Sequence, residues 1–299
     1  MSVELQTNNT GWKNITKIII PYILIVGIFQ YLGYIAVGLN INGLINEKST
    51  FQFFFITIFD FLGTVFIVWL FGKYVDKESF KRLGFETSSS YFTKDILLGL
   101  IIGFIIMAAD FLILLAFNQI QFKGLQYNMS DLMLSIGIFT IVALSEELLI
   151  RGYVLSNLMA SCNKYLALII SSIIFSLMHG LNPNINWFGF IDLFLAGILL
   201  GGSYIYTKNL WFPIALHFSW NFFQGTIFGF NVSGLNGYSI IIIGHHQNTI
   251  WNGGAFGFEG SVLSILFQLI AIIIVFVIFK KREIKDREDI IPEVSLANL

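Results

Sequence analysis

Charged residues are scarce in this sequence. Asp, Glu, Lys and Arg make up 12% of its 299 residues, about half of the roughly 25% typical of soluble domains. Seventeen basic and eighteen acidic side chains are too few to cover the surface of a soluble globule of this size. The net charge of −1 provides no basic surface, so we expect no nucleic-acid partner. Four prolines exclude a collagen-like repeat.

Cysteine is nearly absent as well. The single cysteine, Cys162, excludes a disulfide within the chain. It lies in an apolar stretch without a cysteine-protease motif around it, so we interpret it as a small packing residue. We expect no cleavable signal peptide, because the first apolar run is longer than the roughly 7–15 residues of a signal sequence.

Apolar residues are abundant instead. They make up 56% of the chain, the mean hydropathy is +0.78, and there are 32 phenylalanines. Charge-poor runs of about 20 residues, the length that spans a bilayer, occur eight times, at 17–39, 51–72, 95–118, 132–159, 163–181, 187–206, 211–229 and 260–280. The sequence therefore predicts an all-α fold: one polytopic membrane domain (1–299) with about eight transmembrane helices.

The basic residues predict the orientation of these helices. With both termini in the cytoplasm, all of the seventeen basic residues except Lys48 and Lys123 fall in cytoplasmic segments, as the positive-inside rule requires. The segment 73–94 then forms a cytoplasmic loop, 231–259 a Gly-rich external loop, and 282–299 a short cytoplasmic tail. We expect a multi-pass protein of a bacterial plasma membrane.

Two glycine pairs and two loop histidines have structural interpretations. Gly99/Gly103 and Gly197/Gly201 have the Gly-x-x-x-Gly spacing that lets helices approach closely. We expect contacts within the chain, and an oligomer interface is the alternative. His245 and His246, in the external loop, are interpreted as solvated side chains.

Ionisable residues inside apolar spans are costly, and each is a candidate functional residue. Asp60, Asp110 and Asp192 stand alone in their helices, so we expect them to pair with polar groups of other helices or to be neutral. The remaining ionisable residues fall into three patterned segments.

The first pattern is Glu146-Glu147-x-x-x-Arg151. On a helix, Glu147 and Arg151 are neighbours on one face, so we predict a buried ion pair that holds the geometry. Glu146 points elsewhere and is left without a cation. A carboxylate in such a setting is suited to act as a general base.

The other two patterns are Phe175-x-x-x-His179 and His217-x-x-x-Asn221. Each places its two side chains on one helical face. Glu146 and His179 lie fourteen and sixteen residues from the turn near 160–163, which is about 21–24 Å along each helix. The carboxylate and one imidazole are therefore predicted at a similar depth.

A carboxylate, two imidazoles and an amide inside a membrane suit the hydrolysis of a peptide bond. Glu146 would take a proton from water, while Asn221 and a histidine would donate hydrogen bonds to the oxyanion. Alternatively, Glu146, His179 and His217 would ligate zinc and activate its water. The His-Glu-x-x-His motif of soluble zinc proteases is absent, so the metal stays unknown.

The ordered set of three patterns, within a core at about 130–230, resembles the CPBP (Abi) family of intramembrane proteases. That family includes the type II CAAX prenyl endopeptidases and bacterial proteins of bacteriocin processing or self-immunity, and it has been classed with the metalloproteases. The resemblance implies Glu146 as the activating base with His179 assisting, and His217 and Asn221 at the oxyanion. It further implies Glu147 and Arg151 in support, with Phe175 part of the second pattern.

The leading hypothesis is an intramembrane endopeptidase acting on a peptide or protein, for which a prenylated or membrane-associated substrate is a family-level expectation. A non-catalytic bacteriocin-immunity or scaffold protein of the same fold is the main alternative. A proton-coupled transporter is the third, and it predicts an inverted internal repeat that the sequence does not show.

Overall fold

The computed structural model describes residues 10–39, 48–244 and 247–290. The loop histidines His245 and His246 and the last part of the expected tail lie outside the described residues. The described part of that tail is helical, because the last helix continues ten residues beyond its expected end at 280, through Ile290.

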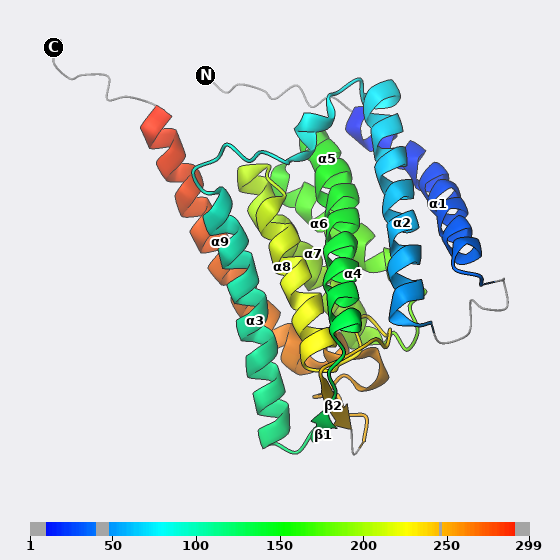
Figure 1. The fold of residues 1–299 in the computed structure, drawn as a ribbon. Coiled ribbons are helices and arrows are strands. Elements are labelled where there is room, and N and C mark those ends of the chain that lie inside the picture. The colour runs from blue at the N-terminus through cyan, green and yellow to red at the C-terminus, as the bar shows by residue number, and fades with distance from the viewer. Residues whose placement is uncertain (1–9, 40–47, 245–246, 291–299) are drawn as a thin grey trace, which may run out of the picture.

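The described residues are mainly α-helical (Figure 1). The α-helices are α1 (Thr10–Ala36), α2 (Thr50–Phe71), α3 (Phe92–Ala116), α4 (Met129–Glu147), α5 (Ser156–Ser161), α6 (Lys164–Met178), α7 (Trp187–Thr207), α8 (Trp211–Asn221) and α9 (Val262–Ile290). Short π- and 3₁₀-helical turns extend or connect them, at Gly72–Asp76, Phe80–Leu83, Leu148–Leu155, Phe222–Ile227, Gly254–Phe256 and Phe258–Gly260.

Asparagines start three of the helices that carry or adjoin the predicted site. The side chain of Asn128 accepts hydrogen bonds from the first backbone N–H groups of α4, Asn163 does the same for α6, and Asn186 for α7. Such caps satisfy N–H groups that have no partner within the helix. All three lie at or beside breaks between the predicted spans.

Within the described residues, six helical segments are long and apolar enough to cross a membrane: Gly11–Ala36, Thr50–Asp76, Phe92–Ala116, Met129–Ser161, Trp187–Thr207 and Val262–Asp286. Together with the helical content they confirm the predicted all-α, polytopic membrane fold. The spans expected at 163–181 and 211–229 correspond to the shorter α6 and to α8 with its π-helical extension. The count of eight stays a prediction.

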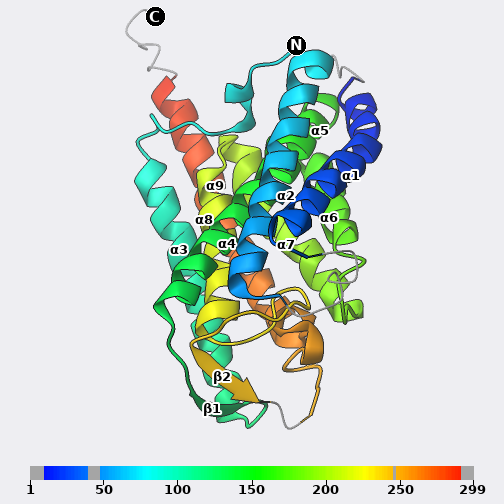
Figure 2. The ribbon, with the colours of Figure 1, turned by 45° about the vertical axis from the view of Figure 1, so that its right-hand side comes forward.

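Two hydrophobic clusters hold the bundle together. One is formed mainly by α1, α2, α6 and the continuous helical segment of α4, the π-helical turn Leu148–Leu155 and α5. The other is formed mainly by α3, α8 and α9. The pairs that pack along each other include α1 with α2, α2 with α4, α4 with α8, and α3 with α8 (Figures 1 and 2). The predicted site residues come from α4 and the π-helical turn after it, from α6 and the residue that ends it, and from α8, so the site lies where the two clusters meet.

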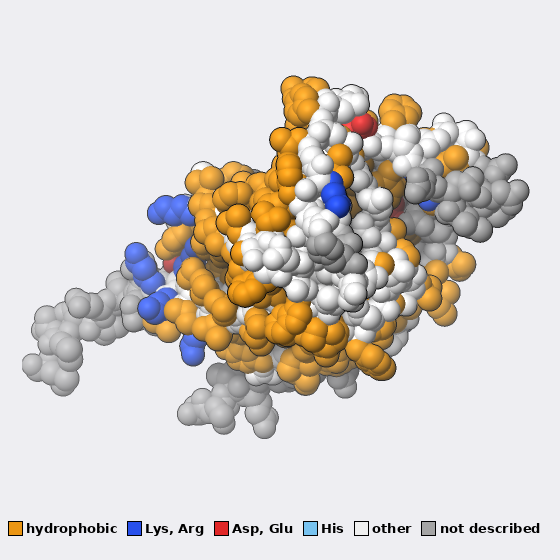
Figure 3. Space-filling model, turned by 90° about the horizontal axis from the view of Figure 1, so that it is seen from below, with side chains coloured by type: hydrophobic (Ala, Val, Ile, Leu, Met, Phe, Trp, Pro, Cys, Tyr) orange, Lys and Arg blue, Asp and Glu red, His pale blue; other side chains and the backbone are white. Residues whose placement is uncertain are grey.

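The outer surface carries large apolar side chains. Ile20 and Ile23 of α1, Leu112 of α3 and Ile273 of α9 are each more than 60% exposed. Seen from the end of the bundle opposite the termini, hydrophobic side chains spread over the flanks, and Lys and Arg side chains gather at one edge (Figure 3). Exposed apolar belts of this kind face lipid in membrane proteins.

The sequence analysis missed a small sheet. Strand β1 (Gln121–Leu125) pairs antiparallel with β2 (Ile241–Gly244), with an irregular register between Phe122 and Gly124. Both strands lie in segments read as loops, and they project from one end of the bundle (Figure 2). The sheet ties the α3–α4 connection to the 231–260 segment.

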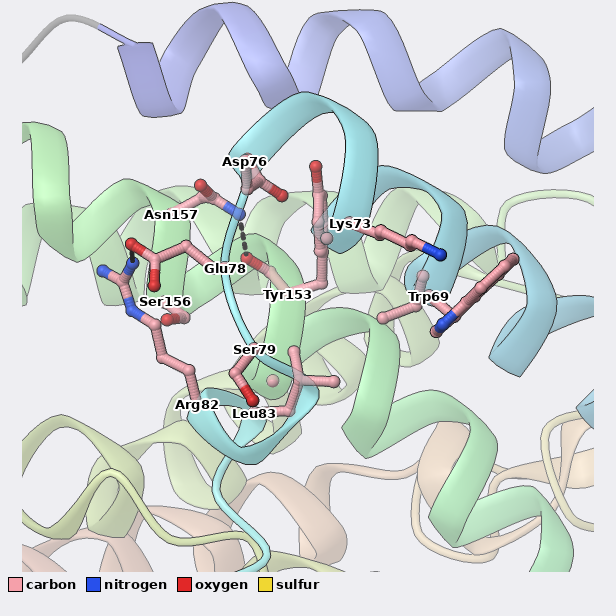
Figure 4. A pocket seen from close by; sticks show the side chains of 13 residues that line it. Trp69, Lys73, Asp76, Glu78, Ser79, Arg82, Leu83, Tyr153, Ser156 and Asn157 are labelled. Atoms are coloured by element: carbon pink, nitrogen blue, oxygen red, sulfur yellow. Dashed lines mark hydrogen bonds and ion pairs between the residues drawn. The ribbon is translucent and has the colours of Figure 1, made fainter.

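The start of α1, the end of α9 and the connection between α2 and α3 lie at the opposite end (Figure 1). That connection borders a cavity of about 240 Å³. The opposite wall of the cavity is formed by the helical residues that follow Arg151, from Gly152 to Asn157 (Figure 4). Two acidic and two basic side chains line it, namely Asp76, Glu78, Lys73 and Arg82. No predicted site residue lines this cavity, so it is separate from the site.

Both glycine pairs make close helix contacts within the chain. A Cβ on Gly99 would lie 2.7 Å from the Leu216 nitrogen and 2.8 Å from the Phe212 oxygen, both in the backbone of α8. Gly197 and Gly201 of α7 face Ser172 and Leu168 of α6 in the same way. These contacts confirm the interpretation as intrachain packing.

The close contact between α3 and α8 predicts that a methyl group added at Gly99 lowers the stability of the protein. Gly99→Ala forces the two backbones apart, so we expect a loss of about 1–3 kcal/mol in stability and a lower midpoint of thermal unfolding in detergent. Gly27→Ala is the matched control, because no atom lies within 4 Å of its added Cβ. Equal midpoints for the two variants would contradict this account.

Candidate active site

The side chain of Glu147, at the end of α4, is the acceptor that joins two of the patterned segments. Its Oε1 accepts a hydrogen bond from Arg151 Nη1 at 2.7 Å and a second from His217 Nδ1 at 2.8 Å. Glu147 is fully buried. The expected pair with Arg151 is therefore present, and the contact with His217 on α8 was not anticipated.

Arg151 is buried beside this carboxylate. Its Nη2 donates to the Gly197 carbonyl of α7 at 3.2 Å, and its guanidinium carbon lies 4.7 Å from the centre of the Phe175 ring. One side chain thus contacts α4, α6 and α7. Burial of a guanidinium is tolerated where it is paired and hydrogen-bonded in this manner.

The backbone after Glu147 changes its winding. Residues Leu148–Leu155 form a π-helix, and Phe222–Ile227 form another directly after Asn221. π-Helical turns in α-helices are frequent at functional sites. The helices that carry Glu147 and Asn221 therefore depart from α geometry immediately beyond these two residues.

His179 caps the C-terminal end of α6. Its Nδ1 lies 2.9 Å from the Phe175 carbonyl oxygen. Because a carbonyl only accepts, Nδ1 carries the proton, and Nε2 is left to face the site. The Phe175 and His179 rings are in contact, with centroids 4.8 Å apart, which accounts for the aromatic residue in the second pattern.

Both imidazoles turn Nε2 toward Glu146. The Oε2 of Glu146 lies 3.8 Å from Nε2 of His179 and 3.8 Å from Nε2 of His217. These distances are too long for direct hydrogen bonds. In His217, Nδ1 donates to Glu147, so its Nε2 is free in the same way as that of His179.

Glu146 differs in part from its predicted setting. Its Oε2 is buried and has no hydrogen-bond partner among the described residues, as expected for a carboxylate without a cation. The side chain as a whole is 27% exposed, which is more than its place within an apolar span predicts. Partial exposure gives water a route to the carboxylate.

Asn221 lies one turn after His217 on α8 and is buried. The spacing of four residues puts its amide on the same helical face as the imidazole. Its side chain provides two N–H donors one helical turn from His217.

This set of atoms favours the binding of a molecule that donates hydrogen bonds. With neutral rings, both Nε2 atoms and Glu146 Oε2 are hydrogen-bond acceptors that face one another. A water molecule supplies the donors that such an arrangement needs, and protonation of one ring supplies another. The geometry is therefore suited to holding and deprotonating water near two imidazoles.

The alternative zinc set does not form a recognised ligand group. Among the described residues, no group of three or more His, Cys, Asp or Glu side chains has the arrangement of a metal site. Glu146, His179 and His217 therefore do not fit zinc as they stand, and we derive no step through a metal.

The isolated aspartates differ from one another. Asp60 accepts from Gln30 of α1 at 2.6 Å and from Ser145 of α4 at 3.4 Å, the expected pairing with other helices. The carboxyl oxygens of Asp110 have no hydrogen-bond partner among the described residues, whereas Asp192 of α7 faces the side chains of Ser264 and Gln268 on α9.

Glu259 is a candidate site residue that the three sequence patterns do not include. It was treated as the end of an external loop, but its side chain is only 5% exposed and experiences the charges of His179 and His217. The signal was available: Glu259 is the sole Asp, Glu, Lys or Arg from Asn231 to Gly260.

Comparison with known proteins matches one family. The family model described as type II CAAX prenyl endopeptidase Rce1-like matches residues 128–223, about a third of the chain. The matched segment contains all seven predicted site residues. No curated protein and no solved structure matches the chain. The match confirms the resemblance drawn from the three patterns, and it supports an intramembrane CAAX-type protease at the level of the family.

Arg151 and Arg82 each form an i,i+4 ion pair, but only the pair of Arg151 is buried. We therefore predict that their replacement lowers the free energy of unfolding by very different amounts. Arg151→Met leaves Glu147 as an unmatched buried charge, so we expect a loss of about 3–5 kcal/mol in the free energy of unfolding. Arg82 forms the same i,i+4 pair with Glu78, but both side chains are about half exposed. Arg82→Met should therefore cost at most about 1 kcal/mol. Similar shifts in thermal unfolding for both variants would contradict the role given to Arg151.

Proposed function

We propose that this protein is an intramembrane endopeptidase in which Glu146 activates the water that attacks a peptide bond. One observation carries the proposal: Glu146 Oε2 is buried without a hydrogen-bond partner and lies 3.8 Å from Nε2 of both imidazoles. The family match at residues 128–223 supports the same class of reaction.

In the proposed reaction, Glu146 takes a proton from water, and the water oxygen attacks the carbonyl carbon of the scissile bond. Negative charge then develops on the carbonyl oxygen. The Nε2–H of a protonated His217 and the amide of Asn221 donate hydrogen bonds to this oxyanion, and each such donor contributes about 3–4 kcal/mol. When the C–N bond breaks, the proton held by Glu146 passes to the leaving amine, with His179 assisting.

Glu147 and Arg151 support this chemistry without contacting the substrate. Glu147 fixes the proton of His217 on Nδ1, so that Nε2 faces the reaction. Arg151 donates a hydrogen bond to Glu147 and holds its carboxyl group beside the ring. A carboxylate behind an imidazole also stabilises the ring when it is protonated.

The substrate class follows from the location and the family. A site within a helix bundle that exposes apolar side chains to lipid suits a peptide anchored in or at the membrane. We therefore propose a peptide or protein substrate with a lipidated or otherwise membrane-bound end, in a bacterial plasma membrane with both termini in the cytoplasm. The three patterns are complete, and no observation favours the non-catalytic alternative.

Glu146→Gln tests the assignment. The reporter is a farnesylated CAAX peptide with a fluorophore and a quencher on either side of the scissile bond, presented in vesicles with the purified protein. Gln keeps the size of the side chain but cannot accept the proton, so we expect a loss of about 10²–10⁴-fold in kcat. Glu78→Gln, an exposed residue at the cavity near the termini, should retain full activity.

Undiminished cleavage by the Glu146→Gln variant would refute the role of this carboxylate. A wild-type protein that cleaves neither the prenylated reporter nor its unprenylated counterpart, while protecting cells from a peptide toxin, would favour the immunity alternative.

A further inference from the structure

Glu259 is a buried carboxylate outside the matched segment. It lies in the short turn Phe258–Gly260, immediately before α9. Burial raises the pKa of Glu259 above its ordinary value, while hydrogen bonds from Ser233 and the two site imidazoles act in the opposite direction. A carboxylate that is withdrawn from water in this way requires compensating partners.

Ser233 supplies two of those partners, one from its backbone and one from its side chain. Its backbone N–H donates to Glu259 Oε2 at 2.6 Å, and its hydroxyl donates to the same oxygen at 2.7 Å. Ser233 adopts the left-handed conformation, with φ of 48°, which is uncommon for a residue other than glycine. The two short hydrogen bonds to a carboxylate hold the turn in this conformation.

The Ser233 turn is joined to the turn that follows His179. The Ser233 carbonyl accepts from Asn182 Nδ2 at 3.1 Å, and the Asn182 N–H donates to the His179 carbonyl at 2.9 Å. At the next residue, a Cβ on Gly234 would lie 2.0 Å from the Pro183 oxygen. The two turns are therefore in backbone contact, and Glu259 anchors one of them.

Glu259 also lies within electrostatic reach of the imidazoles, because His179 and His217 both act on its carboxyl group.

We propose that Glu259 is a positioning residue of the active site. It clamps the Ser233 turn against the turn after His179. This inference rests on the proposed function and extends it, because Glu259 lies outside the family match and in the external segment.

The experiment compares kcat and KM of Glu259→Ala, Glu259→Gln and Ser233→Ala with wild type, on the farnesylated reporter and per folded molecule. We expect Glu259→Ala to lower kcat by at least about tenfold with KM within about twofold, since a misplacement of 1 Å can cost about 100-fold. Gln retains an oxygen that accepts from Ser233, so it should restore part of kcat. Ser233→Ala loses only the hydroxyl bond and should show a smaller loss.

Asn252→Ala is the matched control. Asn252 is fully buried in the same external segment, but its side chain bonds to Gln119, Gln247, Thr249 and Gly254 and not to the turn after His179. It should lower the thermal midpoint while leaving kcat per folded molecule unchanged. The proposal is overturned if Glu259→Ala keeps the wild-type kcat, or if Asn252→Ala loses as much.

A spectroscopic readout separates this inference from the proposed function. In ¹⁵N-histidine NMR of the full-length protein in nanodiscs, Glu259→Gln should move the ring signals of His179 and His217, assigned through His179→Gln and His217→Gln. Asn252→Ala should leave these signals in place. Unmoved signals in Glu259→Gln overturn the positioning role whether or not the protein cleaves the reporter.

Discussion

One oxygen atom, Glu147 Oε1, accepts hydrogen bonds from Arg151 and from His217, and the arrangement of the site depends on it. A buried carboxylate is tolerated when it is paired with an opposite charge and accepts hydrogen bonds, and for Glu147 both hydrogen bonds go to this one oxygen. Arg151 supplies the charge from the same helix, and His217 supplies a donor from α8. The same contact places the proton of His217 on Nδ1. One hydrogen bond therefore both stabilises the buried carboxylate and turns Nε2 of His217 toward Glu146.

This contact requires α4 and α8 to lie at a fixed separation and rotation. On one side, α8 packs against α3. There Gly99 and Gly103 of α3 lie so close to α8 that no methyl group fits between the two helices. On the other side, Arg151 reaches the Gly197 carbonyl of α7, and α7 packs closely on α6, which ends at His179. The glycines far from the reacting atoms thereby contribute to the 3.8 Å distances between Glu146 and the two rings.

The sequence predicts those parts of the structure that depend on local spacing. Apolar runs mark the helices, asparagines mark several of their starts, and the four-residue interval between Glu147 and Arg151 predicts their ion pair. The contact between His217 and Glu147 depends on the rotation of two helices seventy residues apart, which no local pattern encodes. The strands β1 and β2 have five and four residues, too few for a periodic signal in a loop. Glu259 joins the site only because a turn folds back onto α6.

The central claim is that Glu146 delivers a water oxygen to the scissile carbonyl. A single turnover in H₂¹⁸O, with protein in excess of the reporter peptide, tests this claim most directly. Activation of water places one ¹⁸O atom in the new carboxylate of the product during the first turnover. A first-turnover product that carries only ¹⁶O, with the heavy isotope appearing later, would show that the carboxylate itself attacks and would contradict the account.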